Sequence, residues 1–266
     1  MPHTFACALR WADMDMLGHV NNVRYLDFLS AARDALFEGR PAGRARVLHH
    51  RVEFAAPLVF HRHPVLVDSW VTATDGGRVA LVHEVYDEQD GQRRLYLRAS
   101  TVLDHQLDTS EQALADTHRG DAQEWRELSH PQRATRSSFE IQVRRADVDE
   151  SGGVRDGALF EYLQESRVRY LMDLHHRGES WMHHVIARTD VEYLRPMPFR
   201  STPYVVHSWI GHVGTKSFTI CAEVLDGDDV AAVATVVMVT FDKEAQRAAP
   251  MADAQRARLE QELRGD

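Results

Sequence analysis

The sequence has few cysteines, no long apolar run and no excess of positive charge. Its 266 residues carry 31 lysines and arginines against 40 aspartates and glutamates, a formal net charge of −9. A nucleic-acid-binding protein needs a cationic face for the phosphate backbone, so this class is not favoured. The two cysteines, Cys7 and Cys221, are too few for a secreted disulfide scaffold, and we expect both to be buried thiols.

Apolar residues are spread along the chain and form no membrane-spanning run. No stretch approaches the roughly 20 consecutive apolar residues that a transmembrane helix needs. The first residues, MPHTFACALRW, lack the basic segment and long apolar segment of a signal peptide. We therefore expect a cytoplasmic protein with no membrane partner.

The chain contains an internal repeat. Residues 12–33 (ADMDMLGHVNNVRYLDFLSAAR) match residues 146–167 (ADVDESGGVRDGALFEYLQESR) at one constant offset. Residues 52–71 match residues 191–210 at a slightly larger offset, and both segments contain Val-Glu, two prolines and Ser-Trp in the same order. A change of loop length between the two blocks explains the change of offset. The sequence is therefore a duplication.

Both repeats predict the same order of elements: a short alternating strand, an Asp-rich turn, one helix and four strands. Period-two alternation in VALVHEVY and FTICAEVL is typical of antiparallel strands with one buried face. One long helix beside an antiparallel sheet is an α+β architecture. The predicted strands are 5–11, 46–54, 64–74, 78–87 and 94–104 in the first repeat, and 139–145, 184–193, 203–212, 216–225 and 230–242 in the second.

These patterns predict four segments. Residues 1–104 form the first repeat and residues 137–250 the second. The polar residues 105–136 form a connector with a short helix near 110–115, and residues 251–266 form a C-terminal helix.

The Asp-rich turn of the first repeat carries the most specific motif. Residues 13–22 read Asp-Met-Asp-Met-Leu-Gly-His-Val-Asn-Asn, followed by Tyr25-Leu26 and Arg33. This segment resembles the helix entry of hotdog-fold thioesterases, in particular the long-chain acyl-CoA and acyl-carrier-protein branches; the 4-hydroxybenzoyl-CoA branch shares only the Asp-x-Asp. The resemblance implies two tandem hotdog domains, each an antiparallel sheet wrapped around one helix, packed as a pseudo-dimer with the sites between the halves.

The residues of this turn suit thioester hydrolysis on chemical grounds. Asp15 precedes the helix, where a carboxylate can act as general base or nucleophile. The first backbone N–H groups of the helix, near Asn22, have no intrahelical partner and lie at the positive end of the dipole, so they can stabilise an oxyanion. The resemblance assigns the base or nucleophile role to Asp15.

Other residues of the first repeat have weaker assignments. In the acyl-carrier-protein branch a histidine and a downstream glutamate contribute, which implies roles for His19 and Glu53, although Leu17 stands where that branch has an asparagine. Asp13 and Asn21 can equally be helix-capping residues, and His19 and Glu53 can be structural. Arg33 and Arg167 are expected to be structural.

The second repeat keeps Asp149 but changes its neighbours. Gly153, Arg155 and Asp156 replace His19, Asn21 and Asn22. A carboxylate near an oxyanion site repels the developing negative charge unless it turns away. We expect the Asp149 site to be weakened, altered or inactive.

Other site types are not predicted. None of the 16 histidines lies at metal-ligand spacing from a cysteine or carboxylate along the chain, so we expect no metal site and no cofactor beyond the coenzyme A of the substrate. G-x-S-x-G, P-loop and dinucleotide motifs are absent. Arg78, Lys216 and Ser217 lie at predicted strand starts, where Arg78 and Lys216 can reach coenzyme A phosphates.

The sequence thus predicts an acyl-CoA thioesterase that can pair as a homodimer. Two alternatives remain: a hotdog hydratase or dehydratase, and a non-catalytic acyl-CoA-binding protein. Chain length of the acyl group, aromatic preference and the choice between coenzyme A and carrier protein stay open.

Overall fold

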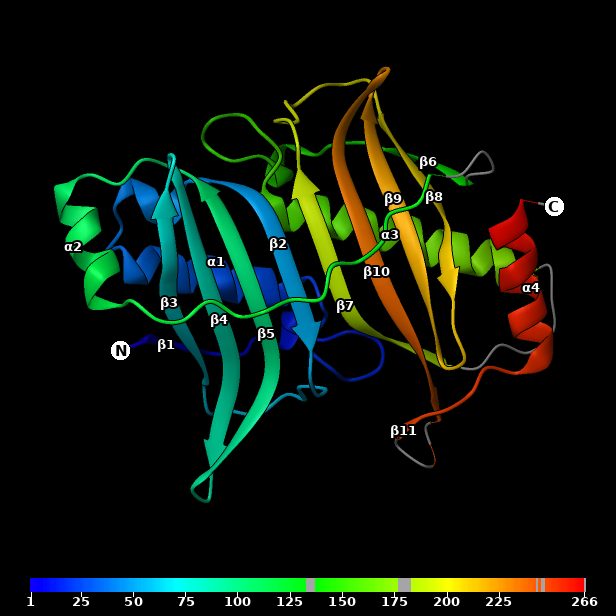
Figure 1. The fold of residues 1–266 in the computed structure, drawn as a ribbon, viewed down its shortest axis with the longest axis horizontal. Helices are drawn as coiled ribbons and strands as arrows, with labels where there is room; N and C mark the ends of the chain where they lie inside the picture. Colours follow the sequence, from blue (N-terminus) through cyan, green and yellow to red (C-terminus); the bar gives the residue numbers. More distant parts are fainter. Residues whose placement is uncertain (133–136, 177–182, 243, 245–246, 266) are drawn as a thin grey trace. The chain divides into compact units, whose positions relative to one another are not determined.

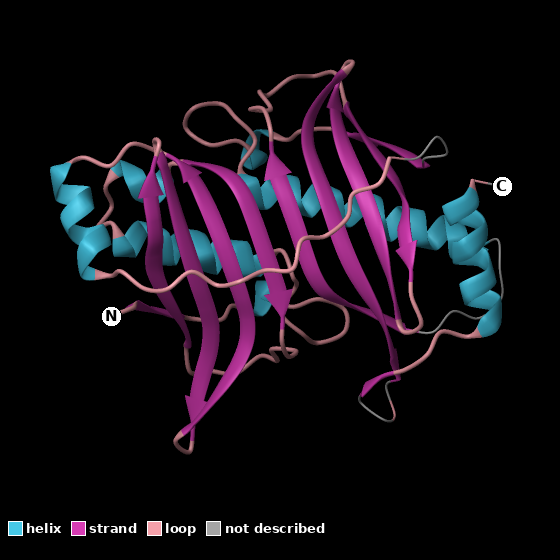
Figure 2. Cartoon of the chain, in the orientation of Figure 1, coloured by secondary structure: helices cyan, strands magenta, loops and turns pink. Residues whose placement is uncertain are grey.

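The computed structural model describes residues 1–132, 137–176, 183–242, 244 and 247–265. The chain divides into two compact units, Met1–Arg126 and Glu127–Asp266. Each unit contains one antiparallel sheet and one long helix that runs along a face of that sheet (Figures 1 and 2).

The first unit follows the predicted order of elements. Its sheet has the strand order β1-β3-β4-β5-β2, and all pairs are antiparallel. Its elements are β1 (His3–Cys7), α1 (Arg24–Leu36), β2 (Arg46–Phe54), β3 (Val65–Asp75), β4 (Arg78–Gln89), β5 (Gln92–Asp104) and α2 (Thr109–Thr117), with 3₁₀ turns at Trp11–Asp13 and Pro41–Arg44.

Helix α1 packs on the sheet through one apolar face. Tyr25, Leu29, Ala32 and Leu36 recur at helical spacing and are buried, and the helix contacts β1 and β3. Burial of a large apolar side chain contributes about 1.5–3 kcal/mol, so this face holds the helix to the sheet. The loop that enters α1 is therefore placed beside the start of β3.

The second unit repeats this arrangement. Its strand order is β6-β8-β9-β10-β7, with β11 paired to β10. Its elements are β6 (Ser137–Ile141), α3 (Asp156–His176), β7 (His183–Tyr193), β8 (Tyr204–Val213), β9 (Ser217–Asp226), β10 (Asp229–Asp242), β11 (Arg247–Ala248) and α4 (Asp253–Arg264), with a 3₁₀ turn at Arg145–Asp147.

Helix α4 adds to the core of this unit. Leu259 is buried in one cluster with Tyr170 of α3 and Phe218 of β9. The two sheets also share a register shift at matching places, between Val71 and Ala73 in the first and between Ile210 and His212 in the second. This agreement in detail supports the duplication.

Three predictions about the first strand of each unit are wrong. Strand β1 ends at Cys7, four residues before the predicted end at Trp11, because the chain turns at Trp11–Asp13, where Asp13 accepts a hydrogen bond from the Arg10 N–H. Strand β6 likewise ends at Ile141. Cys221 is buried as predicted, but Cys7 is only half-buried, since β1 is an edge strand.

The segment after β5 contains α2 at Thr109–Thr117, and four residues of the predicted connector, 133–136, lie outside the described part of the chain. Within the described residues, every helix is too short or too polar to cross a bilayer.

Glu111 of α2 anchors the 3₁₀ turn that follows α1. Its buried carboxylate accepts hydrogen bonds from the backbone N–H groups of Ala42 and Asp108, each at 3.0 Å, and lies 2.9 Å from His105 Nε2. Burial raises the pKa of Glu111, but these hydrogen bonds, led by that of Asp108, outweigh it and lower the pKa below the ordinary value.

We expect Glu111→Gln to lower the free energy of unfolding near neutral pH by on the order of 1–2 kcal/mol, because a charge-assisted hydrogen-bond network is weakened. A carboxylate with a lowered folded pKa stabilises above its unfolded pKa and loses this contribution as pH falls through the folded pKa. The deficit should therefore shrink between about pH 5 and about pH 3 in urea unfolding curves. A deficit that does not change with pH, or an equal deficit in the surface control Glu88→Gln, would contradict this assignment.

Candidate active site

The loop before α1 is closed by the buried carboxylate and carbonyl of Asp13. Its Oδ2 accepts a hydrogen bond from the Arg10 N–H at 2.7 Å, and its carbonyl accepts one from the Asn21 N–H at 2.8 Å. These bonds join the two ends of the loop. Asp13 thus has the structural role that remained open from the sequence.

Asp15 lies within this closed loop and organises it. Its Oδ1 accepts hydrogen bonds from the backbone N–H groups of Leu17 at 2.8 Å and His19 at 3.1 Å. The Asp15 N–H donates to the His19 carbonyl at 2.7 Å, and Gly18 makes the turn with a φ of 75°. Among the described residues, no hydrogen bond reaches the second carboxylate oxygen, Oδ2. One oxygen of Asp15 is therefore fixed, and the other is left to interact with water or a ligand.

A second loop, between β2 and β3, supports the first. The Val20 N–H donates to the Leu58 carbonyl at 2.8 Å, and His19 forms a β-bridge with Val59. The backbone of His19 is thereby held on both sides. Its half-exposed imidazole makes no hydrogen bond to another residue in the described part of the chain.

The start of α1 follows immediately. Asn21 Oδ1 accepts a hydrogen bond from the Val23 N–H at 3.3 Å, so Asn21 acts as a cap. The Asn22 N–H donates to no other described residue and lies at the positive end of the helix. Burial, followed by the charges of Tyr96 and Asp15, raises the pKa of Tyr25 in the first turn.

Glu53 is positioned by the sheet. It lies on β2 in register with Arg98 of β5 and is half-buried. Within the described residues, no hydrogen bond joins Glu53 to Asp15 or His19. Arg33 is buried on α1 and contributes, after burial, to a lowered pKa of His83 on β4, so it faces the sheet and not the loop.

The loop of the second unit has the same backbone geometry. Asp149 Oδ1 accepts hydrogen bonds from the N–H groups of Ser151 at 2.8 Å and Gly153 at 3.2 Å, and Gly152 has a φ of 82°. It also accepts one from Ser151 Oγ at 2.6 Å, a bond that Leu17 cannot supply to Asp15. The Asp149 carboxylate therefore accepts one more hydrogen bond than the Asp15 carboxylate.

The side chains that follow Asp149 make hydrogen bonds within the loop or belong to the start of α3. Arg155 donates from Nη2 to the Ala146 carbonyl at 3.0 Å, and Asp156 is the first residue of α3. Tyr162 donates to Asp147 Oδ2 at 2.5 Å, which ties the loop to the helix. Burial lowers the pKa of Arg167, which is enclosed on the same helix, to about 10.

The residues predicted to contact coenzyme A phosphates lie away from the aspartate loops of their own units. Arg78 begins β4, and Lys216 and Ser217 stand at the start of β9, all next to hairpin turns. The register of β1 on β3 places Cys7 and the following loop at the Val65 end of β3, whereas Arg78 pairs with Asp75 at its other end. Within each unit, the structure thus sets these residues at the opposite end of the sheet from the loop aspartate.

The sequence pattern did not predict a group of exposed apolar side chains beside Asp15. They come from the two paired loops, and two of them, Trp11 and Phe60, make an edge-to-face contact with ring centroids 5.7 Å apart. Because they sit in irregular segments, no periodicity marks them. They are Trp11, Met16, Leu17, Val59 and Phe60; the matching positions in the second unit are Arg145, Glu150, Ser151, Pro198 and Phe199.

Comparison with known families identifies one match. A model of the thioesterase-like superfamily matches residues 9–110 and 143–259, which include most of both repeats. A search of curated proteins finds no match.

Solved structures with the same fold cover nearly the whole chain. A Lactobacillus plantarum protein described as an oleoyl thioesterase superposes with a TM-score of 0.70 at 13% identity, covering 91% of this chain and 98% of its own. A 12:0-ACP thioesterase from Umbellularia californica gives 0.67 at 14% identity, covering 90% and 97%. An acyl-ACP thioesterase from Bacteroides thetaiotaomicron gives 0.60 at 14% identity, covering 89% and 97%. At such identities the likeness shows the fold, and it confirms the predicted tandem hotdog repeats.

Gly18 tests how tightly the Asp15 loop is constrained. A Cβ at this position meets no atom within 4 Å, so Gly18→Ala adds only backbone strain at a φ of 75°. We expect the free energy of unfolding to fall by about 1–2 kcal/mol. Gly18→Asn should cost less, because asparagine tolerates the left-handed region. Equal costs for Ala and Asn, measured by urea unfolding, would show that the left-handed conformation is not what this position requires.

Proposed function

The chain belongs to the thioesterase-like superfamily, and from that premise we propose that it hydrolyses the thioester of an acyl-CoA to a free acid and coenzyme A. The Asp15 loop is the working site of this proposal. The observation that carries it is the unequal use of the two Asp15 oxygens, one fixed by backbone N–H groups and the other without a hydrogen bond among the described residues.

In the proposed reaction, Asp15 acts through Oδ2. It accepts a proton from water as the water oxygen adds to the thioester carbonyl, or it adds to that carbonyl itself and forms a mixed anhydride that water hydrolyses after the thiolate has left. The Asn22 N–H stabilises the resulting oxyanion at the helix N-terminus. The C–S bond then breaks, and the thiolate leaves as coenzyme A. His19, on the same loop, is proposed to supply the proton that the departing sulfur takes up.

The surroundings of Asp15 support an acyl substrate. Trp11, Met16 and Leu17 expose apolar surface on the loop itself, and Val59 and Phe60 do so on the supporting loop. Exposed apolar surface that is gathered in one place is typical of a binding site. We propose that this surface receives the acyl chain. Glu53 is proposed to act by positioning, and contacts of Arg78, Lys216 and Ser217 with coenzyme A phosphates stay a prediction.

An acyl-carrier-protein thioester is the second candidate substrate. Two of the structures with this fold are described as ACP thioesterases. The chemistry at Asp15 is the same for both carriers, so the two candidates differ only in what the leaving thiol is attached to. Parallel assays with acyl-CoA and acyl-ACP of the same chain length separate them.

We further propose that the Asp149 site contributes little. Its Oδ1 takes an additional hydrogen bond from Ser151 Oγ, and Asp156 brings a negative charge to the helix start where the first site has Asn22. Both differences weaken a carboxylate base and an oxyanion site.

We expect Asp15→Asn to reduce kcat/KM for thiol release by at least about 100-fold, because it removes the base or nucleophile while keeping the oxygen that accepts the loop hydrogen bonds. The matched change Asp149→Asn should leave kcat/KM within about twofold of wild type. Thiol release from a panel of short, long and aromatic acyl-CoAs, followed with a chromogenic trap, measures both.

Three results would overturn parts of this proposal. Equal losses in the two variants would remove the assignment of a single working site. Tight acyl-CoA binding without thiol release would favour a non-catalytic binding protein. Water addition to an enoyl-CoA with the thioester intact would favour a hydratase.

A further inference from the structure

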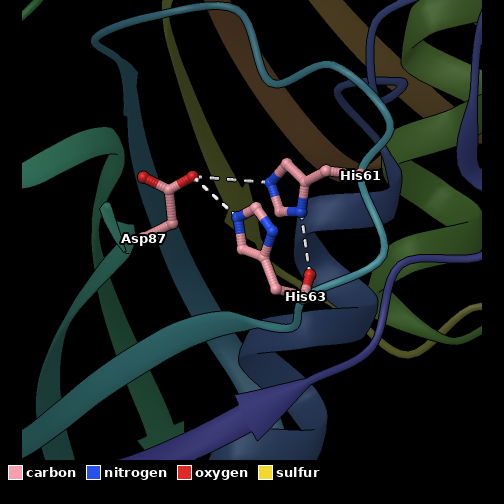
Figure 3. Close-up of side chains that lie close together, drawn as sticks. All are labelled: His61, His63 and Asp87. Atoms are coloured by element: carbon pink, nitrogen blue, oxygen red, sulfur yellow. Dashed lines mark hydrogen bonds and ion pairs between the residues drawn. The ribbon is translucent and has the colours of Figure 1, made fainter. Parts of the chain in front are cut away.

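Two histidines and one aspartate meet near the Asp15 loop but outside it. His61 and His63 lie on the loop between β2 and β3, and Asp87 lies near the end of β4 (Figure 3). Asp87 Oδ2 is 3.5 Å from His61 Nε2 and 3.4 Å from His63 Nε2. The Asp87 side chain is only 1% exposed, that of His61 14% and that of His63 43%. The cluster is therefore an interior site that opens to the surface at His63.

The hydrogen bonds fix which nitrogen of His61 faces Asp87. His61 Nδ1 is 2.8 Å from the His63 backbone carbonyl, which can only accept, so Nδ1 carries the proton (Figure 3). In the neutral ring, Nε2 is then a lone-pair donor directed at a carboxylate oxygen. His61 Nε2 is buried and has no hydrogen-bond partner among the described residues. Two electron-rich atoms face each other here, and a cation between them would remove the repulsion.

His63 presents a similar nitrogen. Gln89 Nε2 donates to Asp87 Oδ2 at 3.0 Å, which orients its amide, and the same nitrogen lies 3.0 Å from His63 Nε2. In the tautomer with its proton on Nδ1, this ring nitrogen can accept the amide N–H through its lone pair. Both imidazoles therefore turn their Nε2 atoms toward Asp87.

The Asp87 carboxylate has unused capacity as a hydrogen-bond acceptor. Tyr96 donates to Oδ2 at 2.8 Å. Oδ1 is buried and has no hydrogen-bond partner in the described part of the chain. A buried carboxylate of this kind is costly unless a positive charge compensates it.

The second unit shows what occupies the matching place there. Arg200, Thr202 and Asp226 stand at the positions of His61, His63 and Asp87. Arg200 Nη1 forms an ion pair with Asp226, and its guanidinium lies 3.6 Å from the centre of the Tyr204 ring. One repeat thus neutralises the aspartate with a permanent cation of its own. The other replaces that cation with two lone-pair donors.

From this comparison we propose that His61, His63 and Asp87 bind a divalent transition-metal ion of the zinc type, which takes the place that Arg200 fills in the second repeat. Imidazole nitrogen and carboxylate oxygen are the donor set that zinc accepts, commonly with water as the fourth ligand.

The distances suit such an ion. A tetrahedral metal with bonds of about 2.0–2.1 Å sets its ligand atoms about 3.3–3.4 Å apart. The two Nε2–Oδ2 separations, 3.5 and 3.4 Å, are close to this edge length. The two rings are stacked, with centroids 3.6 Å apart and planes at 4°, so binding requires them to rotate apart. His63 is the more exposed ring and can make this rotation, while the Nδ1–carbonyl bond holds His61 in place.

The proposed metal ion would stabilise the loop that supports the Asp15 loop. The metal would join the β2–β3 loop to the end of β4. Its first ligand, His61, is only two residues beyond Val59, which together with Leu58 holds the Asp15 loop through His19 and Val20. An ion here stiffens the support of that loop without touching Asp15. The proposal does not depend on the reaction that the loop performs.

The direct test is metal binding to the full-length protein after treatment with a chelator. Zinc chloride is titrated by calorimetry, and cobalt chloride by visible absorption, for wild type and two variants. We expect wild type to bind one equivalent of zinc per chain and to gain several degrees in Tm with zinc in excess. His63→Thr should weaken zinc binding by at least about tenfold. His61→Arg should abolish it while keeping a zinc-independent Tm, because the second repeat shows that arginine fits this place.

A control and two contrary results complete the test. His175→Ala, on the exposed surface of α3, should bind zinc as wild type does. Absence of stoichiometric zinc binding by wild type would overturn the proposal and leave a protonated histidine as the partner of Asp87. Zinc binding that persists unchanged in His61→Arg would place the metal elsewhere and overturn it as well.

Discussion

Burial of one helix against one antiparallel sheet is the constraint from which the rest of each repeat follows. In the first unit, Leu29 and Ala32 of α1 are fully enclosed, and the helix contacts β1 and β3. Because β1 leads into the loop that enters α1, fixing the helix also fixes both ends of that loop. The hydrogen bonds of Asp13 and Val20 then close it. The position of Asp15 is thus a consequence of core packing several residues away.

Duplication allowed the two copies of this design to diverge without loss of the fold. Both loops keep the same backbone hydrogen bonds, with Asp15 and Asp149 in the same role and Gly18 and Gly152 at the same positive φ. The differences lie in side chains that the fold does not need. Exposed apolar residues, the His19 imidazole and two asparagines lie on or beside the Asp15 loop, whereas charged and small polar residues occupy the matching positions near Asp149.

Much of this arrangement could be predicted from the sequence, because it depends on local patterns. The period-two alternation of VALVHEVY predicted β4, and the repeated Asp-x-Asp segment predicted the turn before each helix. The end of β1 could not be predicted, since Ala8–Trp11 continue an alternating pattern and the turn depends on hydrogen bonds between Arg10 and Asp13.

The features that the sequence did not predict are those that depend on distant segments. Asp87 is 24 residues from His63, and the pairing of β3 with β4 brings them together, so the spacing of histidines and carboxylates along the chain does not reveal this cluster. The apolar patch beside Asp15 likewise needs the bridge between His19 and Val59 to become visible. The separation of Arg78 from Asp15 within one unit follows from strand length and register, which the sequence pattern leaves open.

The central claim is that the neighbours of Asp15, and not the carboxylate alone, make the first repeat the working site. The most direct measurement is thiol release from acyl-CoA by a chain in which His19, Asn21 and Asn22 are replaced by the Gly, Arg and Asp of the second repeat. That loop sequence already supports the same backbone geometry around Asp149. The account predicts a folded protein whose kcat/KM falls by at least about 100-fold, as for loss of an oxyanion donor. Activity close to wild type would contradict it, because Asp15 would then need neither the free imidazole nor the uncharged helix start.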